Sequence, residues 1–257
     1  MNAKQQFIAL KTIMIKEFLR FIRIWVQTIL PPAITTTLYF IIFGNLIGSQ
    51  IDDMDGFSYM EYIVPGLILM AIITNSYANV VSSFYGSKFQ HNIEEMIISP
   101  VPNYIILLGF ISGGVTRGIM VGGIVTLVSM FFTDLHFEHI FVTLIVVFLT
   151  AVLFSLAGFI NGVYANSFDD ISIVPTFILT PLTYLGGVFY TIKLLPDFWQ
   201  SVSLINPILY MVNTFRYGII GVSDIDVTTA FIIIIGFVVA LFYWSLTLLN
   251  KGIGIRT

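Results

Sequence analysis

A short polar stretch, residues 88–102, interrupts an otherwise very apolar chain and carries its most prominent group of chemically active side chains. Two adjacent carboxylates, Glu94 and Glu95, precede three apolar residues, and a Pro-x-Pro sequence follows. Acidic side chains stabilise the positive end of a helix dipole, and proline ends a helix because it lacks a backbone N–H. The pattern predicts a short helix lying flat at a membrane surface. The alternative is a solvated pair of surface acids.

Arg117 is a second candidate, because it lies near the middle of the apolar segment 104–132. A cation at that depth is costly unless it faces the interior of a helix bundle or a hydrated cavity. Several glycines in the sequence 113–123 surround it and would let another helix backbone approach closely. Arg117 is therefore either a polar anchor in a substrate path or gate, or a structural cation satisfied by backbone carbonyls.

Two stripes of polar and small side chains recur at helical spacing inside apolar segments. The first consists of Asn75, Asn79, Ser82, Ser83 and Gly86, and the second of Thr176, Thr180, Thr183 and Tyr184. Pro175 and Pro181 interrupt the second segment and suggest that it is mobile. Each stripe could line a substrate path or form a seam of interhelical hydrogen bonds, and we favour the seam for the first.

Other kinds of chemistry have little support in the sequence. No Gly-x-x-x-x-Gly-Lys-[Ser/Thr] phosphate-binding motif occurs, so we expect ATP and Mg²⁺ to bind to a partner subunit and no cofactor to bind here. His136, Glu138 and His139 stand close together, but a solvated loop is a better interpretation than a metal site. No catalytic triad or carboxylate pair is recognisable, so we expect no enzyme. The net charge of −3 gives no indication of a nucleic-acid partner.

The composition requires lipid as the solvent for much of the chain. Of the 257 residues, 57% are hydrophobic and only 10% are charged, whereas a soluble globular domain has about 25% charged residues. A transmembrane helix needs about 20 mostly apolar residues. Six segments meet this requirement: residues 24–47, 61–85, 104–132, 140–164, 171–190 and 230–249. The chain is therefore expected to be an all-α, polytopic membrane protein.

Residues 4–23 have the pattern of an amphipathic helix. Phe7, Leu10, Met14, Phe18 and Phe21 form one stripe, and Lys16, Arg20 and Arg23 lie on the opposite side. Such a helix lies in the membrane interface with its basic residues toward anionic lipid headgroups. The alternative is a solvated extension of the first span.

Residues 191–222 are harder to interpret. The part from Leu204 to Val222 is apolar enough to enter a membrane, but Asn206-Pro207 and Arg216 interrupt it. A full crossing here would place the basic C-terminal residues on the outer side. We therefore expect a re-entrant or interfacial pair of helices at the outer face.

Lysine and arginine set the expected orientation, because cytoplasmic loops are enriched in them. If both termini are cytoplasmic, the inner segments contain Lys4, Lys11, Lys16, Arg20, Arg23, Lys88, Lys251 and Arg256. The outer segments then contain only Lys193 and Arg216, beside many acids such as Asp52. Six spans with both termini in the cytoplasm satisfy this pattern.

Several runs make the whole chain resemble the ABC-2 family of transporter permeases. They are residues 21–28, 38–48, 57–66, 92–102 and 175–190, of which the last two are the most specific. The resemblance implies one ABC-2 transmembrane domain over residues 1–257. It further implies a connecting helix at 4–23, a coupling helix at 89–101 and re-entrant helices at 191–222.

The same resemblance implies a function. The chain would be the permease of an ATP-driven exporter in a bacterial inner membrane, working with a second copy of itself and two copies of a separate ABC ATP-binding protein. Its substrate would be a lipid, a glycan or a drug-like molecule. The implied ATPase-coupling residues are Phe89, Asn92, Glu94, Glu95, Met96, Ile97, Ile98 and Pro100. Candidate residues of a substrate path or gate are Asn75, Asn79, Arg117, Thr180 and Tyr184.

Two other classes of protein compete with this interpretation. A secondary transporter or channel would need no ATPase, but it would want acids deep within its spans for a proton or ion relay. The spans predicted here contain none at that depth. A membrane scaffold that transports nothing is the third possibility, and co-purification of a stoichiometric ATPase would separate it from the first.

Overall fold

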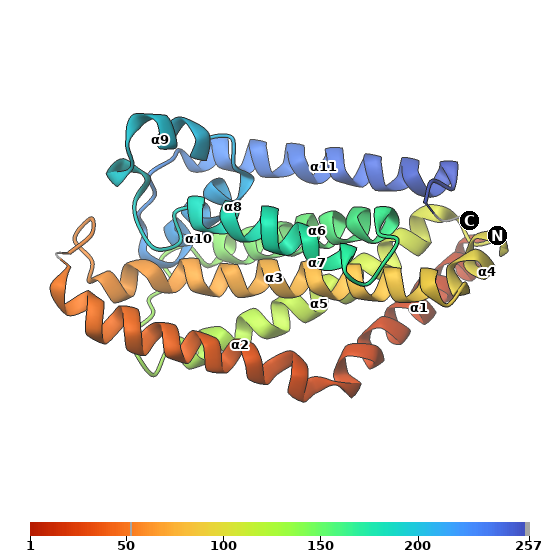
Figure 1. Cartoon of the computed structure of the whole chain (residues 1–257), viewed down its shortest axis with the longest axis horizontal. Coiled ribbons are helices and arrows are strands. Elements are labelled where there is room, and N and C mark those ends of the chain that lie inside the picture. The colour runs from red at the N-terminus through yellow and green to blue at the C-terminus, as the bar shows by residue number, and fades with distance from the viewer. Residues whose placement is uncertain (52, 255–257) are drawn as a thin grey trace.

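The computed structural model describes residues 1–51 and 53–254, and for residues 45–47 and 49 only the backbone. Asp52 and Arg256, which contributed to the expected orientation, lie outside the described residues. Within that part of the chain the regular structure is helical, apart from an isolated β-bridge between Met54 and Phe57. The helices run side by side in one elongated bundle (Figure 1).

Long helices alternate with short ones along the chain. The longer helices are α1 (Ala3–Arg23), α2 (Trp25–Tyr39), α3 (Tyr59–Phe89), α5 (Asn103–Ser129), α6 (Ile140–Tyr164) and α11 (Val227–Lys251). The shorter ones are α4 (Asn92–Ile98), α7 (Asp170–Val174), α8 (Thr180–Leu185), α9 (Asp197–Ser203) and α10 (Pro207–Ile220). A π-helical segment, Phe40–Ile47, continues α2, and a second, Pro175–Leu179, joins α7 to α8.

Five helices are long and apolar enough to cross a membrane. They are Trp25–Gly44, Tyr59–Phe89, Asn103–Ser129, Ile140–Tyr164 and Val227–Lys251. They correspond to the first four predicted spans and the sixth, and they confirm an all-helical polytopic membrane protein. The bounds differ from the prediction by a few residues, since helix ends depend on local capping that hydropathy does not report.

The fifth predicted span, residues 171–190, is shorter than expected. α7, the π-helical segment and α8 form a single apolar helix, Asp170–Leu185. At about 1.5 Å per residue this helix is roughly 24 Å long, which is less than the about 30 Å of a hydrocarbon core. It ends because the chain turns at Gly186 and Gly187, and Gly187 has a φ of 71° that a side chain would strain.

The two ends of the bundle carry different elements. α4 lies beside the two ends of the chain at one end of the bundle, whereas α9 and the connection from α2 to α3 lie at the other (Figure 1). The predicted docking helix and the predicted outer helices are therefore at opposite ends of the molecule.

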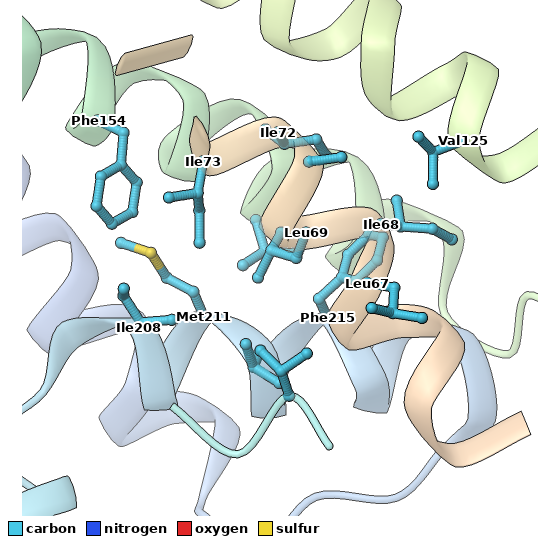
Figure 2. Close-up of a cluster of buried hydrophobic side chains, with 14 of the residues drawn as sticks. Leu67, Ile68, Leu69, Ile72, Ile73, Val125, Phe154, Ile208, Met211 and Phe215 are labelled. Carbon is cyan, nitrogen blue, oxygen red and sulfur yellow. The ribbon is translucent and has the colours of Figure 1, made fainter. Parts of the chain in front are cut away.

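α3 is the central helix of the bundle. In the most apolar 18-residue stretch of α3, 83% is buried, against 17% in the corresponding stretch of the α2 span. α3 is therefore surrounded by protein, while α2 leaves most of its surface open. Figure 2 shows side chains of α3 packed between α5, α6 and α10. The labelled residues are Leu67, Ile68, Leu69, Ile72, Ile73, Val125, Phe154, Ile208, Met211 and Phe215.

Glycines on the neighbouring helices allow this close packing. A Cβ added to Gly122 of α5 would lie 2.5 Å from the Ile72 side chain, and one added to Gly158 of α6 would lie 2.5 Å from the carbonyl oxygen of Tyr77. Real Cβ atoms do not approach so closely, so larger residues would push both helices away from α3. This confirms that the glycines of α5 permit close approach of another helix.

α9 and α10 occupy the segment predicted to be a helical pair. Asn206 and Pro207 do separate them: the Asn206 side chain accepts from the backbone N–H of Ile208, and Pro207 stands in the first turn of α10, where no N–H is needed. Arg216 interrupts the apolar stretch, but it does not interrupt the helix. Arg216 lies within α10, because its charged group has partners inside the protein.

Candidate functional site

A sharp reversal separates α4 from α3. His91 sits between them with a φ of 58°, in the left-handed region that non-glycine residues seldom adopt. The helix predicted over residues 89–101 is therefore too long at both ends. Phe89 is the last residue of α3, and Pro100 follows the end of α4. Hydropathy and proline spacing could not reveal that α3 continues to the reversal.

The end of α3 is held against the end of α6. Lys88 Nζ donates to the backbone carbonyls of Val163 and Ala165, at 2.9 and 2.7 Å. A cation beside the last carbonyls of a helix also interacts favourably with its dipole. Next to it, the ring of Phe89 lies 5.2 Å from that of Phe168 in the α6–α7 connection, and both side chains are exposed. The end of α3 that precedes α4 is therefore fixed by contacts with α6 and with the α6–α7 connection.

α4 has one anchored face and one exposed face. Ile93 is fully buried, and Met96 and Ile97 are partly buried against the same apolar cluster. The opposite face consists of Asn92, Glu95 and Ile98, spaced by three residues. Ile98 is 86% exposed, so this helix presents an isoleucine and a carboxylate away from the bundle.

Glu94 differs from Glu95 in its surroundings. Its carboxylate lies 2.9 Å from Nδ1 of His91, and the pair is an ion pair when the histidine is protonated. Glu95 has no such partner among the residues that the structure describes. Of the two adjacent acids, Glu95 is therefore the one left open to an external group.

Four of the five residues predicted to form a substrate path line two cavities in the bundle. They are Asn75, Arg117, Thr180 and Tyr184. The first two line the arginine cavity, of about 340 Å³, between α2, α3 and α5. The other two line the threonine cavity, of about 190 Å³, between α3 and the helix Asp170–Leu185. Met70 and Thr74 line both cavities, which therefore adjoin each other along α3.

Asn79, the fifth predicted path residue, lines neither cavity. Nη2 of Arg20 donates to its backbone carbonyl and to its side-chain oxygen, at 2.9 and 2.7 Å. One turn further along α3, Ser83 donates to the carboxylate of Glu17 at 2.6 Å. Glu17 is fully buried, and it pairs with Arg20 at 3.3 Å and with Lys16 at 3.8 Å. The first predicted stripe therefore divides: Asn79 and Ser83 form an interhelical seam, and Asn75 faces the arginine cavity.

This seam corrects the predicted orientation of α1. Arg20 was expected to face lipid headgroups, but it reaches inward to α3, because the buried carboxylate of Glu17 attracts it. Of the predicted apolar stripe, Phe21 is buried and Phe7 is 66% exposed, so the face that meets α5 is rotated from the expected one. It consists of Ile13, Glu17 and Phe21.

Sequence reasoning missed Glu17, although a signal was present. Glu17 lies four residues from both Ile13 and Phe21, so it is an acid on an otherwise apolar helix face. The groove that receives this face is also visible as a pair of glycines four residues apart on α5. A Cβ at Gly113 would lie 2.7 Å from Cβ of Glu17, and one at Gly109 would collide with Ile13.

Arg117 has no hydrogen bond or ion pair to any residue that the structure describes. Its Nε is buried without an acceptor. The interpretation as a structural cation satisfied by backbone carbonyls therefore has no support in the contacts, and the interpretation as a group that faces a cavity agrees with them.

Arg216 is a second cation buried inside the bundle, and sequence reasoning did not predict its burial. It is 1% exposed, and its guanidinium donates to the carbonyls of Tyr62 and Gly187 at 3.3 and 2.6 Å. The guanidinium carbon also lies 3.9 Å from the centre of the Tyr62 ring. Arg216 therefore joins α10, α3 and the turn after α8, which explains why α10 packs on the bundle.

A second polar cluster holds the loops at this end together. Nζ of Lys193 lies 3.1 Å from the carboxylate of Asp224, which also accepts a hydrogen bond from Thr191 at 2.9 Å. The hydrogen bond and the charge of Asp224 raise the pKa of Lys193 above its usual value. The side chain of Asn213 in turn accepts from the backbone N–H of Asp224 at 2.9 Å.

No group of three or more potential metal ligands occurs in residues 1–51 and 53–254. The His139 ring, which belonged to the discounted cluster, stacks on Tyr217 at 4.5 Å between ring centres. Its place at the start of α6 is structural.

The fold and these features define a class: a multi-spanning helical membrane protein with a short helix at one end that exposes one face, and with cavities between its spans that polar residues help to line. Residues 8–220 match the ABC-2 type transporter family, and the chain belongs to this family. It is the permease subunit of an ABC-2 type transporter, and such subunits lack an ATPase domain.

Known relatives agree with this assignment. The chain is 58% identical over 252 residues to the inner membrane transport permease YadH of Escherichia coli strain K12, with 98% of each chain covered. It is 21% identical over 215 residues to nodulation protein J of Rhizobium leguminosarum bv. viciae, with 83% of each chain covered. A nodulation protein J of Rhizobium meliloti is also 21% identical, over 237 residues.

Membership of the family carries three consequences. The protein is a multi-pass protein of the inner membrane. It takes part in transport together with an ATP-binding subunit, and ATP is hydrolysed on that subunit.

Proposed function

We propose that this permease exports a lipid, glycan or drug-like substrate, and that the exposed face of α4 receives the movement of the ATP-binding subunit. One observation carries the proposal: α4 is anchored by Ile93 while Glu95 and Ile98 face away from the bundle. An apolar side chain with 86% exposure beside an unpaired carboxylate is suited to a groove in a partner protein. α1 acts as the connecting helix, and its Glu17–Arg20 seam transmits the motion to α3.

The complex contains two copies of this chain and two copies of a separate ABC ATP-binding protein. In this arrangement residues 1–257 form one transmembrane domain, α9 and α10 are re-entrant helices at the outer face, and both termini are cytoplasmic. The position of α4 and the two chain ends at one end of the bundle supports this orientation (Figure 1). So does the concentration of basic residues at that end.

Substitutions on the two faces of α4 test the coupling role. Ile98→Asp and Glu95→Lys should abolish stoichiometric co-purification of the ATP-binding subunit with the tagged permease. Glu94→Gln is the matched control, since its carboxylate is already held by His91. If the ATP-binding subunit still co-purifies with both exposed-face variants and ATP hydrolysis is unchanged, α4 is not the coupling helix.

Chemical labelling tests the orientation, because the natural chain contains no cysteine. A membrane-impermeant maleimide added to intact spheroplasts should label Ile205→Cys, at the α9–α10 connection, and should spare Ile98→Cys until the membrane is opened. Both side chains are exposed, at 78% and 86%, so access through the membrane decides the result. Labelling of Ile98→Cys from outside would reverse the proposed topology.

A further inference from the structure

The arginine cavity has the size and lining of a ligand site. Its volume of about 340 Å³ falls within the range of about 300–1,000 Å³ found for small-molecule sites. Polar side chains from three helices meet on it: Gln27, Thr35, Tyr39, Thr74, Asn75 and Arg117. Apolar groups such as Pro31, Leu67 and Met70 complete the wall. A site of this composition suits a molecule with both a polar and an apolar part.

The cavity carries positive charge that no described side chain neutralises. None of its lining residues is acidic, and Arg117 has no hydrogen-bond or ion-pair partner within the part of the chain described. The buried acid of α1, Glu17, pairs with Arg20 and Lys16 and makes no ion pair with Arg117.

A guanidinium has five donors and stays charged, so leaving the buried Nε of Arg117 without an acceptor is costly. Arg216 shows how this bundle treats a structural arginine, with two carbonyl partners and an aromatic ring. Arg117 has none of these and faces a cavity instead. The missing partner of Arg117 therefore has the chemistry of an anion that enters from outside the chain.

The walls of the cavity suggest how such an anion would arrive. α2 forms one wall. Only 17% of the most apolar 18-residue stretch of its span is buried, so lipid can reach this helix. Leu30, Ile34 and Leu38 on α2 are each 51% exposed. An apolar chain could lie along α2 while the head group reaches Arg117.

We infer that Arg117 binds the anionic head group, a phosphate or a carboxylate, of an amphiphile whose apolar part lies along α2. This inference rests on the proposed function, because it names the class of substrate that the permease would select. The amide of Gln27 and the second amide hydrogen of Asn75 supply further hydrogen bonds to the head group. A neutral or cationic amphiphile lacks the charge that the cavity requires.

Binding can be measured on the full-length permease in a neutral detergent, without the ATP-binding subunit. The thermal unfolding midpoint is followed while dodecyl phosphate, inorganic phosphate or dodecyltrimethylammonium is added, and an apparent Kd is taken from each titration. Dodecyl phosphate should stabilise the protein and dodecyltrimethylammonium should not. If inorganic phosphate binds as tightly as dodecyl phosphate, the ligand is a free anion and the amphiphile is excluded.

Variants locate the site. Arg117→Gln should weaken dodecyl phosphate binding by about tenfold or more, the loss expected for charge-assisted hydrogen bonds. Gln27→Glu keeps Arg117 and places a competing carboxylate in the cavity, so it should weaken binding in the same direction even if Arg117→Gln does not fold. Arg23→Gln, at an exposed arginine outside the cavity, should leave the Kd unchanged. Unchanged binding in Gln27→Glu, or an equal loss in Arg23→Gln, would overturn the inference.

This assay separates the inference from the proposed function. If dodecyl phosphate binds through Arg117 but the assembled complex moves no substrate when ATP is hydrolysed, the site is right and the exporter is wrong. If the complex exports a substrate while Arg117→Gln and Gln27→Glu bind dodecyl phosphate normally, the exporter is right and the site is wrong.

Discussion

Arg216 and Arg117 are both arginines inside the helix bundle, and their surroundings are opposite. Arg216 is 1% exposed, bonded to two backbone carbonyls and placed over the Tyr62 ring. Arg117 faces a cavity, and its Nε has no acceptor in the described structure. Arg216 joins α10, α3 and the turn after α8, whereas Arg117 joins no other element in the described part of the chain.

This difference shows how a cation in a membrane protein can be assigned a role. Arg216 is held through two of its nitrogens and the Tyr62 ring, and although its Nη1 has no acceptor, the side chain is closed off from any ligand by burial. A guanidinium that lacks partners contributes little to stability and keeps its donors for a ligand. The Glu17–Arg20 seam lies between these cases, because its charges are paired but Arg20 remains 29% exposed.

The largest effect is expected from removing Arg216. Arg216→Met should lower the free energy of unfolding by about 3 kcal/mol, since two buried carbonyls lose their donor. Denaturant titration of the permease in detergent measures this. Arg23→Gln, at an exposed position, is the control and should stay within about 0.5 kcal/mol of the natural protein. A small effect of Arg216→Met would remove the distinction between the two arginines.

Gly113→Leu tests the seam between α1 and α5. The added side chain meets Glu17 and Asn79 at once, so about 2 kcal/mol of stability should be lost to overpacking. Gly123→Leu on the same helix is the matched control, because a Cβ there has nothing within 4 Å. That variant should be neutral or more stable, since leucine is the better helix former. Equal behaviour of the two variants would show that α1 is not seated in this groove.

Glu17→Gln should have a smaller effect, about 1 kcal/mol of destabilisation. The change leaves Arg20 and Lys16 without their counter-charge, but both are partly exposed and water screens them. Thermal unfolding measures the difference between this variant and the control Glu95→Gln, in which an exposed acid is changed. A loss as large as that of Arg216→Met would mean that the Glu17–Arg20 pair is as deeply desolvated as Arg216.

The smallest effect on stability is expected from Arg117→Gln, within about 0.5 kcal/mol of the natural protein. No protein contact is lost, so only ligand binding should change. The same denaturant titration used for Arg216→Met makes the comparison direct. Destabilisation by 2 kcal/mol or more in the absence of ligand would identify Arg117 as a structural cation.

Much of the fold was predictable from the sequence. Hydropathy predicted six spans, and five of them are long helices, because a chain of this composition has no other way to satisfy backbone groups in lipid. The sequence run around Glu94 and Glu95 identified α4, since acids and prolines mark the start and end of a helix independently of tertiary contacts. The end of α3 at Phe89 was missed because it depends on Lys88 binding the carbonyls of α6.

The candidate site was only partly predictable. Periodicity placed Asn75, Asn79 and Ser83 on one stripe of α3, but it could not say which of them α1 would cover. That depends on Arg20, which turns inward beside Glu17 and donates to Asn79. Arg20 and Asn79 are 59 residues apart in the chain. Likewise, the sequence showed Arg216 only as a charge that interrupts an apolar stretch, because its acceptors on α3 and in the Gly187 turn are distant in the chain.

The sequence alone determined that the chain is a helical membrane protein with a short amphipathic helix between its second and third spans, because these properties follow from composition and local spacing. Only the tertiary structure decided which polar side chains are satisfied and which remain open. That outcome depends on distances between helices that meet only after folding, and local sequence contains no information about an acceptor supplied by a distant backbone.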